Sequence, residues 1–208
     1  MNAFRYLPRA ASPAIARGLE TAPVVVVMGA RQVGKSTLVR HHPALRDHLY
    51  VTLDDLDAAD EARREPERLL TRAPRMILDE VQRVPELLHA LKRMVDEGPR
   101  VPGRFVLTGS ANLLLMSRVS ESLAGRAVYA SLWPMTGSEL RGEGGTGRWG
   151  ELFEVEVKDW LDRFEGVKPS DWRARAATGG YPVPALELSG PEARAGWFDG
   201  YVRTYLER

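Results

Sequence analysis

One segment constrains the fold of this 208-residue chain more than any other. It begins at Gly29, reads GARQVGKS, and fits the pattern G-x-x-x-x-G-K-[ST] at every fixed position. An uninterrupted apolar run at residues 24–28 precedes it, and a helix-forming segment follows from Lys35. Such a run is typical of a strand that is covered on both faces, as the strands of parallel sheets are. The segment therefore predicts a strand, a glycine loop and a helix, in that order.

The residue types in this loop suit a cradle for phosphate groups. Gly29 and Gly34 permit backbone angles that are closed to other residues, so consecutive N–H groups can point inward. The positive N-terminal end of the following helix would also attract the phosphates, and Lys35 places a cation where β- and γ-phosphates would lie. The residues predicted to contact a nucleotide in the loop are Gly29, Ala30, Arg31, Gln32, Val33, Gly34, Lys35, Ser36 and Thr37.

A pair of acids follows another predicted strand. Residues 76–78 are apolar and are followed directly by Asp79 and Glu80. Because the carboxyl ends of parallel strands meet at one edge of the sheet, these acids are expected beside the phosphate loop. There Asp79 and the hydroxyl of Ser36 would hold Mg²⁺, and Glu80 would accept a proton from a water that attacks the γ-phosphate. Plain helix capping by the two acids is the alternative.

Strand and helix patterns alternate along the first two thirds of the chain. The expected strands cover residues 24–28, 49–53, 76–78, 105–107 and 127–133. The expected helices begin at Pro13 with Ser12 as N-cap, then cover 35–40, 54–71, a segment opened by Pro85, and 113–123. Such alternation implies βαβ units, and hence an α/β fold with helices on both faces of a largely parallel sheet.

The composition changes after Pro134. Residues 141–150 read RGEGGTGRWG, with five glycines, which is typical of a linker or mobile loop. Beyond it, residues 172–177 and 192–206 read as helices, whereas 151–160 fit neither a helix nor a strand clearly. We therefore expect an α/β core over residues 1–140, followed by a linker and a smaller helical part over 141–208.

Composition excludes several classes of protein. With 29 Lys and Arg against 28 Asp and Glu, the net charge of +1 gives no reason to expect a polybasic coat for nucleic acid. The absence of cysteine removes disulfide scaffolds and thiolate metal sites, and the adjacent His41 and His42 predict a solvated helix end rather than a metal site. No apolar run approaches the roughly 18–20 residues of a membrane span, and the first residues contain no signal peptide. We therefore expect a cytoplasmic protein that does not enter the membrane.

Several stretches resemble one family. The first stretch runs from Met28 to Leu38 and contains the glycine loop. The others are LDEVQRVP at 78–85, LTGSAN at 107–112, SLAGR at 122–126, GGYP at 179–182 and YVRTYLER at 201–208. Together they resemble the AAA+-type ATPases, and more narrowly the bacterial and archaeal AAA-domain ATPases that carry a restriction-endonuclease-like C-terminal domain. The resemblance implies a P-loop NTPase fold of the AAA+/ASCE type, with three αβα layers and a small, mostly helical lid.

The resemblance also implies roles for residues outside the loop. Ser110 would be a polar sensor of the γ-phosphate, with Thr108 as the fallback and N-capping as the alternative role of Ser110. Arg126 would be an arginine finger that reaches a neighbouring subunit, with Arg118 as second candidate and a surface salt bridge as the alternative. Pro182 would lie over the adenine, the alternative being a turn that contacts no ligand.

Two functions follow as hypotheses. The first is Mg²⁺-dependent ATP hydrolysis, with ATP and ADP as ligands, coupled to movement of the lid or a partner domain. The second is a nucleotide-gated switch with little turnover, acting on DNA or a protein partner. A small-molecule kinase is disfavoured, because neither a phosphoacceptor site nor a basic lid motif accompanies the loop.

The expected partners rest on the resemblance as well. DNA binding rests on family analogy only, because acids lie between the scattered arginines. A homo-oligomer would form through Arg126. The family pattern continues for a few hundred residues beyond the position of Arg208, so we expect a fragment.

Overall fold

The computed structural model describes residues 6–110, 123–144, 156, 159 and 172–205, in two compact units. The first, called the α/β unit, is Ala11–Trp133, and the second unit combines Met1–Ala10 with Pro134–Arg208. The chain therefore changes unit at Pro134, where the composition changes, and its first ten residues belong with its last part.

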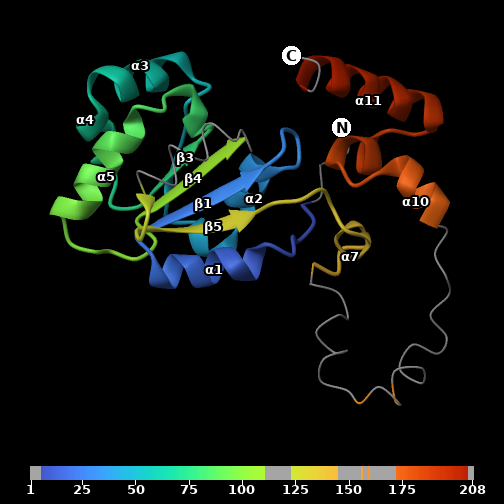
Figure 1. Cartoon of the computed structure of the whole chain (residues 1–208), viewed down its shortest axis with the longest axis horizontal. Helices are drawn as coiled ribbons and strands as arrows, with labels where there is room; N and C mark the ends of the chain where they lie inside the picture. Colours follow the sequence, from blue (N-terminus) through green and yellow to red (C-terminus); the bar gives the residue numbers. More distant parts are fainter. Residues whose placement is uncertain (1–5, 111–122, 145–155, 157–158, 160–171, 206–208) are drawn as a thin grey trace. The chain divides into compact units, whose positions relative to one another are not determined.

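The α/β unit contains a five-stranded sheet in which every pair of neighbouring strands is parallel (Figure 1). The strands are β1 Val24–Gly29, β2 Leu49–Thr52, β3 Met76–Asp79, β4 Phe105–Ser110 and β5 Ala127–Ser131, in the order β2-β3-β4-β1-β5. This confirms the predicted α/β fold with a parallel sheet. The carboxyl ends of all five strands lie along one edge, which we call the carboxyl edge.

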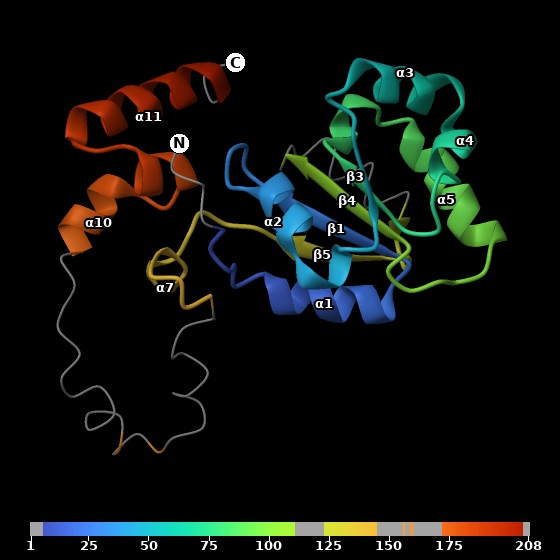
Figure 2. The same cartoon turned by 180° about the vertical axis from the view of Figure 1, so that it is seen from behind.

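Helices cover both faces of this sheet and complete three layers. They are α1 Ser12–Thr21, α2 Lys35–His41, α3 Leu56–Arg64, α4 Pro66–Leu70 and α5 Leu87–Glu97, with short 3₁₀ turns at Pro43–Leu45 and Val81–Arg83. Successive side chains of a strand face opposite sides of a sheet. Val24 and Val26 pack in the main core with α3, α4 and α5, whereas Val25 faces α1. Helix α2 covers the face that is turned to the viewer in Figure 2.

Several boundaries differ from the sequence prediction. Ala11, not Ser12, is the N-cap of α1, and it makes no side-chain capping bond. The helix expected over 54–71 is divided into α3 and α4, because Pro66 has no amide hydrogen with which to continue α3. Strand β5 ends at Ser131 rather than at 133. The helix expected over 113–123 falls almost wholly outside the described residues, as does the undecided segment 151–160.

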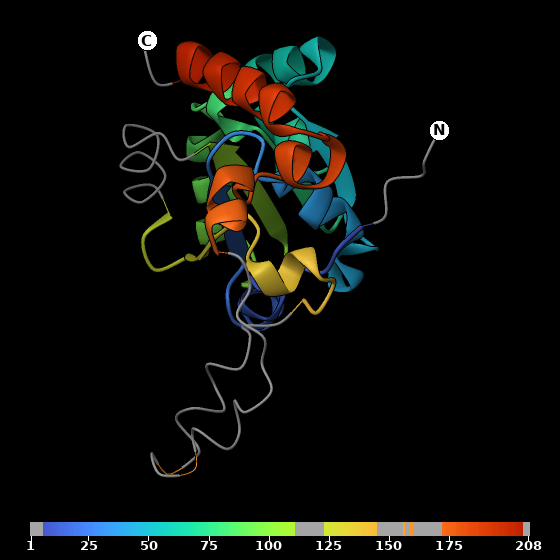
Figure 3. The ribbon, with the colours of Figure 1, turned by 90° about the vertical axis from the view of Figure 1, so that its right-hand side faces the viewer.

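The second unit is helical in its described part (Figure 3). It contains α7 Gly137–Leu140, α10 Trp172–Thr178, a π-helical turn at Val183–Glu187, and α11 Pro191–Tyr205. A buried ion pair joins its two chain segments, because Arg9 Nε donates to Glu139 Oε1 at 3.1 Å. The same carboxylate accepts hydrogen bonds from the amides of Ala10 and Thr136 at 2.7 and 2.6 Å. This pairing explains why residues before α1 belong to the second unit.

Among the helices that the structure describes, none is long and apolar enough to cross a bilayer.

Candidate functional site

The glycine loop leaves β1 at Gly29 and enters α2 at Lys35. Gly29 is held closely, because a Cβ added there would lie 2.3 Å from the carbonyl oxygen of Leu132. Gln32 and Gly34 have positive φ angles of 62° and 95°, and the side chain of Val33 between them is fully buried. Left-handed residues of this kind are typical of loops whose amides form a concave anion site. The loop therefore has a defined shape that its own sequence and the neighbouring strand end impose.

Lys35 is the charged group of this loop, and only 4% of its surface is exposed. Its Nζ donates hydrogen bonds to the carbonyl oxygens of Gly29 and Ala30, at 3.2 and 3.0 Å. Burial lowers the pKa of Lys35, while the nearby carboxylates of Glu80 and Asp79 raise it. The ammonium group thus lies inside the loop on two carbonyl oxygens, which phosphate oxygens could replace as its partners.

Three hydroxyl groups converge on Asp79, whose carboxylate is buried at the end of β3. Ser36 Oγ donates to Oδ1 at 3.1 Å, and Thr108 Oγ1 donates to the same oxygen. The hydroxyl of Tyr50 donates to Oδ2 at 2.6 Å. Burial raises the pKa of Tyr50, and its hydrogen bond to Asp79 raises it further, so the phenol remains protonated and donates. Every one of these hydroxyls fixes the orientation of the carboxylate.

The strand register explains why these groups meet. Thr52 is paired with Asp79 between β2 and β3, and Leu78 is paired with Leu107 between β3 and β4, so Thr108 follows beside Asp79. Tyr50 precedes Thr52 by two positions and therefore faces the same side of the sheet, which α2 covers. Arg40 of α2 lies over the Tyr50 ring, with its guanidinium carbon 4.6 Å from the ring centroid.

Glu80 follows the last residue of β3 in a left-handed conformation, with φ of 59°. Such a backbone costs a non-glycine residue roughly 1–2 kcal/mol. Two hydrogen bonds hold Glu80 in this conformation. Its amide donates to Thr108 Oγ1 at 3.2 Å, and its Oε2 accepts a hydrogen bond from Gln82 Nε2. Gln82 Oε1 in turn accepts from the amide of Ser110 at 3.4 Å. Gln82 thus connects the predicted base to the predicted sensor position.

Sequence reasoning missed Tyr50 and Gln82 as members of this site. Gln82 carried a signal, because it belongs to the stretch LDEVQRVP on which the family resemblance rests. Tyr50 carried none, since a tyrosine in a short strand is ordinary strand composition. Of the two sensor candidates, Thr108 has the direct contacts with Asp79 and Glu80, while Ser110 ends β4 opposite Gly29.

Arg126 lies at the edge of the sheet where the strands begin, opposite the carboxyl edge. Its carbonyl oxygen accepts from the amide of Val24, the first residue of β1, at 3.3 Å. Gly29 is the last residue of that strand, about 17 Å away at the usual rise per residue. The Arg126 guanidinium pairs with both carboxylate oxygens of Asp96, Nη2 to Oδ2 being 2.8 Å, and donates to Ala124 O at 2.8 Å. The structure therefore does not bring Arg126 to the glycine loop of its own chain. Arg118 lies outside the described residues.

Pro182 belongs to the second unit, where it is the N-cap of the π-helical turn. Gly180, two residues before Pro182, is packed tightly, because its carbonyl accepts from the amide of Met135 at 2.6 Å. A Cβ at Gly180 would lie 2.4 Å from the Met135 carbonyl oxygen. The role of Pro182 over an adenine remains a prediction.

The expectation of a solvated helix end is wrong for His42. Its ring is buried, its Nδ1 accepts from the amide of Ala44 at 3.2 Å, and its Nε2 lies 3.1 Å from the carbonyl oxygen of Ser12. The sequence could not show this, because the contact joins the end of α2 to the start of α1. In the described part of the chain, no group of three or more His, Cys, Asp or Glu side chains could hold a metal by itself.

Comparison with known proteins identifies one family. Residues 21–141 match the AAA domain family. An uncharacterized protein of Mycobacterium tuberculosis and another of Mycobacterium bovis are each 33% identical over 202 residues, which is 96% of this chain and 39% of either relative. The chain therefore spans about two fifths of the length of these curated relatives.

The fold has solved counterparts. The Walker-type ATPase of Pyrococcus abyssi is similar with a TM-score of 0.55 and 15% identity, covering 98% of this chain and 78% of that chain. At this identity the likeness concerns the fold, which in this chain is the parallel sheet with flanking helices described above.

Proposed function

We propose that this chain, which belongs to the AAA domain family of P-loop ATPases, binds ATP with Mg²⁺ at the carboxyl edge of its sheet and hydrolyses it there. The observation that carries the proposal is the convergence of the Lys35 ammonium, the Ser36 hydroxyl and the Asp79 and Glu80 carboxylates around one glycine loop. Each of these groups has a defined task in phosphoryl transfer.

The donor set suits a magnesium ion. Mg²⁺ prefers oxygen ligands and keeps several waters, so one hydroxyl and one carboxylate supplied by the protein suffice. Ser36 Oγ and Asp79 Oδ1 lie 3.1 Å apart, and Tyr50 and Thr108 hold the carboxylate from its remaining sides. When bound, the ion would neutralise charge on the phosphates and on the departing group.

The remaining groups would act on the phosphates and on water. The loop amides and Lys35 would bind the β- and γ-phosphates, with phosphate oxygens taking the place of the Gly29 and Ala30 carbonyls on the ammonium. Glu80 would accept the proton of the attacking water. Gln82 engages Oε2 of Glu80, so Oε1 is the oxygen we assign to the water.

The test is the substitution Glu80→Gln, which keeps the shape of the side chain and removes its basicity. We expect ATP turnover to fall by about 10²–10⁴-fold, the usual contribution of a general base, with nucleotide affinity unchanged. Release of free phosphate measures turnover, and a fluorescent adenine nucleotide measures binding. Glu97→Gln, at the exposed end of α5 and outside this site, is the matched control. Turnover at the parent rate in Glu80→Gln would show that Glu80 is not the base.

A nucleotide-gated switch with little turnover is the second candidate, and the Gln82 contact favours it. In the structure the amide of Gln82 occupies one oxygen of Glu80, and the left-handed backbone keeps the carboxylate in that position. A base held in this way would cleave ATP slowly until a partner moved Gln82. Gln82→Ala separates the two functions, since a switch predicts faster turnover in the variant and an unregulated ATPase predicts equal or slower turnover.

A further inference from the structure

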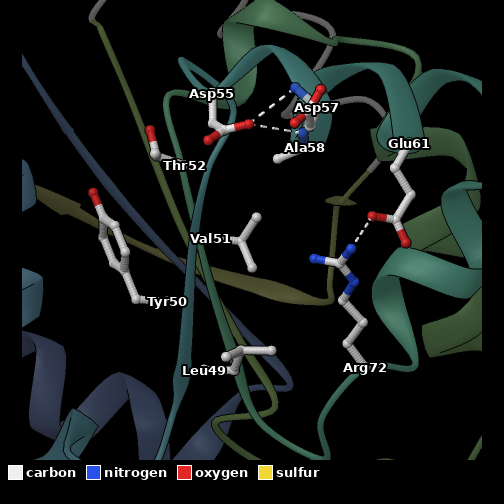
Figure 4. Close-up of a pocket in the computed structure, with 9 residues that line it drawn as sticks. All are labelled: Leu49, Tyr50, Val51, Thr52, Asp55, Asp57, Ala58, Glu61 and Arg72. Carbon is white, nitrogen blue, oxygen red and sulfur yellow. Dashed lines mark hydrogen bonds and ion pairs between the residues drawn. The ribbon is translucent and has the colours of Figure 1, made fainter.

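A cleft of about 390 Å³ opens beside β2, away from the glycine loop (Figure 4). Its walls come from β2, from the start of α3 and from Arg72, which follows α4. Since β2 is the last strand of the sheet on this side, the cleft runs along an edge that pairs with no other strand among the described residues.

The backbone of β2 presents hydrogen-bonding groups to this cleft. The amides of Leu49 and Leu53 donate to Arg75 O and Asp79 O, at 3.0 and 2.9 Å, on the side of β3. Backbone groups of a strand alternate in direction, so the amides of Tyr50 and Thr52 and the carbonyl of Tyr50 face the opposite side. The Thr52 carbonyl instead accepts from the amide of Asp55 at 3.3 Å, in the turn that follows β2. Tyr50 and Thr52 both line the cleft. Open strand edges of this kind are templates for a further strand.

The side chains give the cleft an apolar wall and a negative end. Leu49 is 40% exposed, and Val51 and Ala58 lie near it in the cleft wall. Asp55 and Asp57 stand at the start of α3, where Asp55 Oδ1 accepts from the amides of Asp57 and Ala58 at 2.9 and 3.1 Å (Figure 4). These bonds orient Asp55 and leave the Asp57 carboxylate exposed beside it.

The other end of the cleft is close to neutral. Glu61 pairs with Arg72 through Oε2, and its Oε1 lies 3.9 Å from Arg68 Nε, which itself belongs to an arginine paired with Glu65. Two negative charges are thus balanced there by two positive charges. Glu61 Oε1 is buried and has no hydrogen-bond partner among the described residues. The two aspartates therefore leave the cleft as a whole negative, which repels phosphate backbones and acidic peptides and attracts cationic side chains.

We propose that the outer edge of β2 binds an extended segment of a partner protein with lysine or arginine at alternate positions, which adds a strand to the sheet. The backbone of the segment would pair with the amide and carbonyl of Tyr50 and with the amide of Thr52. The aliphatic stems of its basic side chains would lie on Leu49 and Val51, with the charged ends near Asp55 and Asp57. This surface is separate from the glycine loop, and the inference does not depend on ATP hydrolysis.

The probe is a fluorescein-labelled hexapeptide of alternating lysine and valine, titrated with the full chain without nucleotide and followed by fluorescence anisotropy. We expect saturable binding that Asp57→Lys weakens about tenfold or more, by the loss of one attraction and the gain of one repulsion. Asp60→Lys, on α3 but outside the cleft, is the matched control and should have a much smaller effect. Circular dichroism and thermal melting verify that both variants are folded.

Two further peptides test the mode of binding. A peptide in which glutamate replaces lysine should bind at least about tenfold more weakly, since the cleft is negative. A lysine–valine peptide methylated at alternate backbone nitrogens should lose binding, because it cannot pair with a strand edge. In the complex, hydrogen exchange at the Tyr50 and Thr52 amides should slow.

Several outcomes would overturn the proposal. They are no saturable binding up to about 1 mM peptide, equal binding of the glutamate peptide, equal binding of the methylated peptide, or unchanged affinity in Asp57→Lys. A concentration-dependent dimer that Asp57→Lys abolishes would also overturn it, because the occupant of the edge would then be a second copy of this chain. None of these outcomes bears on whether the glycine loop binds ATP.

Discussion

The carboxyl edge of the sheet and the opposite edge, where the strands begin, both contain basic and carboxylate side chains, but the contacts and burial of these groups differ. At the carboxyl edge, Lys35 and Asp79 are 4% and 3% exposed, and the Asp79 carboxylate accepts hydrogen bonds from residues of α2, β2 and β4. At the opposite edge, Arg126 and Asp96 form an ion pair that remains substantially open to solvent.

The polar contacts at the two edges differ in how firmly they hold their side chains. Water screens an exposed ion pair and the side chains lose entropy in forming it, so such pairs contribute little to stability. A buried carboxylate that accepts three hydroxyl hydrogen bonds cannot reorient without leaving polar groups unsatisfied. The carboxyl edge is therefore preorganised, whereas Arg126 can exchange its ion pair for another partner at small cost.

The largest effect that tests this comparison is expected for Lys35→Ala. The variant removes the cation that would face the β- and γ-phosphates, and hydrogen bonds to charged groups are worth about 1.5–3 kcal/mol each. We expect affinity for a fluorescent adenine nucleotide with Mg²⁺ to fall by about 10²-fold or more, with Lys92→Ala on α5 as control. Unaltered affinity in Lys35→Ala would remove the basis of the proposed function.

An intermediate effect is expected for Tyr50→Phe, which deletes the hydroxyl on Asp79 Oδ2 and keeps the ring under Arg40. Removing a group that orients a metal ligand typically costs about 10–100-fold in metal affinity. We expect the Mg²⁺ concentration for half-maximal nucleotide binding to rise by about tenfold, while binding without Mg²⁺ is unchanged.

The control for this change is Tyr129→Phe on β5, the last strand of the sheet at the end of the strand order away from β2. An equal loss of nucleotide binding with and without Mg²⁺ in Tyr50→Phe would contradict a role through Asp79, and would indicate a general defect of the fold.

The smallest effect is expected for Arg126→Ala. Because the residue lies at the opposite edge and its pair with Asp96 is exposed, nucleotide affinity and melting temperature in dilute solution should match the parent. Asp96→Ala should behave in the same way.

The predicted arginine finger adds one expectation that distinguishes these two variants. If Arg126 serves a neighbouring subunit, turnover per chain should rise with protein concentration in the parent and in Asp96→Ala, but not in Arg126→Ala. Turnover that is independent of concentration in all three proteins would exclude the finger.

Sequence alone determined the local elements of this protein. The alternation of apolar runs and helical segments predicted the parallel sheet, and the pattern from Gly29 to Ser36 predicted the strand, loop and helix, because neighbouring residues along the chain decide these features. The Asp79–Glu80 pair could be placed near the loop for the same reason, since parallel strands all end at one edge.

Only the tertiary structure decided which side chains meet. Tyr50 reaches Asp79, and Gln82 connects Glu80 to Ser110, because strand register and the turn after β3 bring them together across 28 or more residues of sequence. His42 is buried for a similar reason, by contact with Ser12. Arg126 precedes β5 in the sequence as predicted, but the parallel pairing of β5 with β1 puts it at the edge away from the loop. Contacts of this kind depend on pairing between distant strands, and no local pattern of residues specifies them.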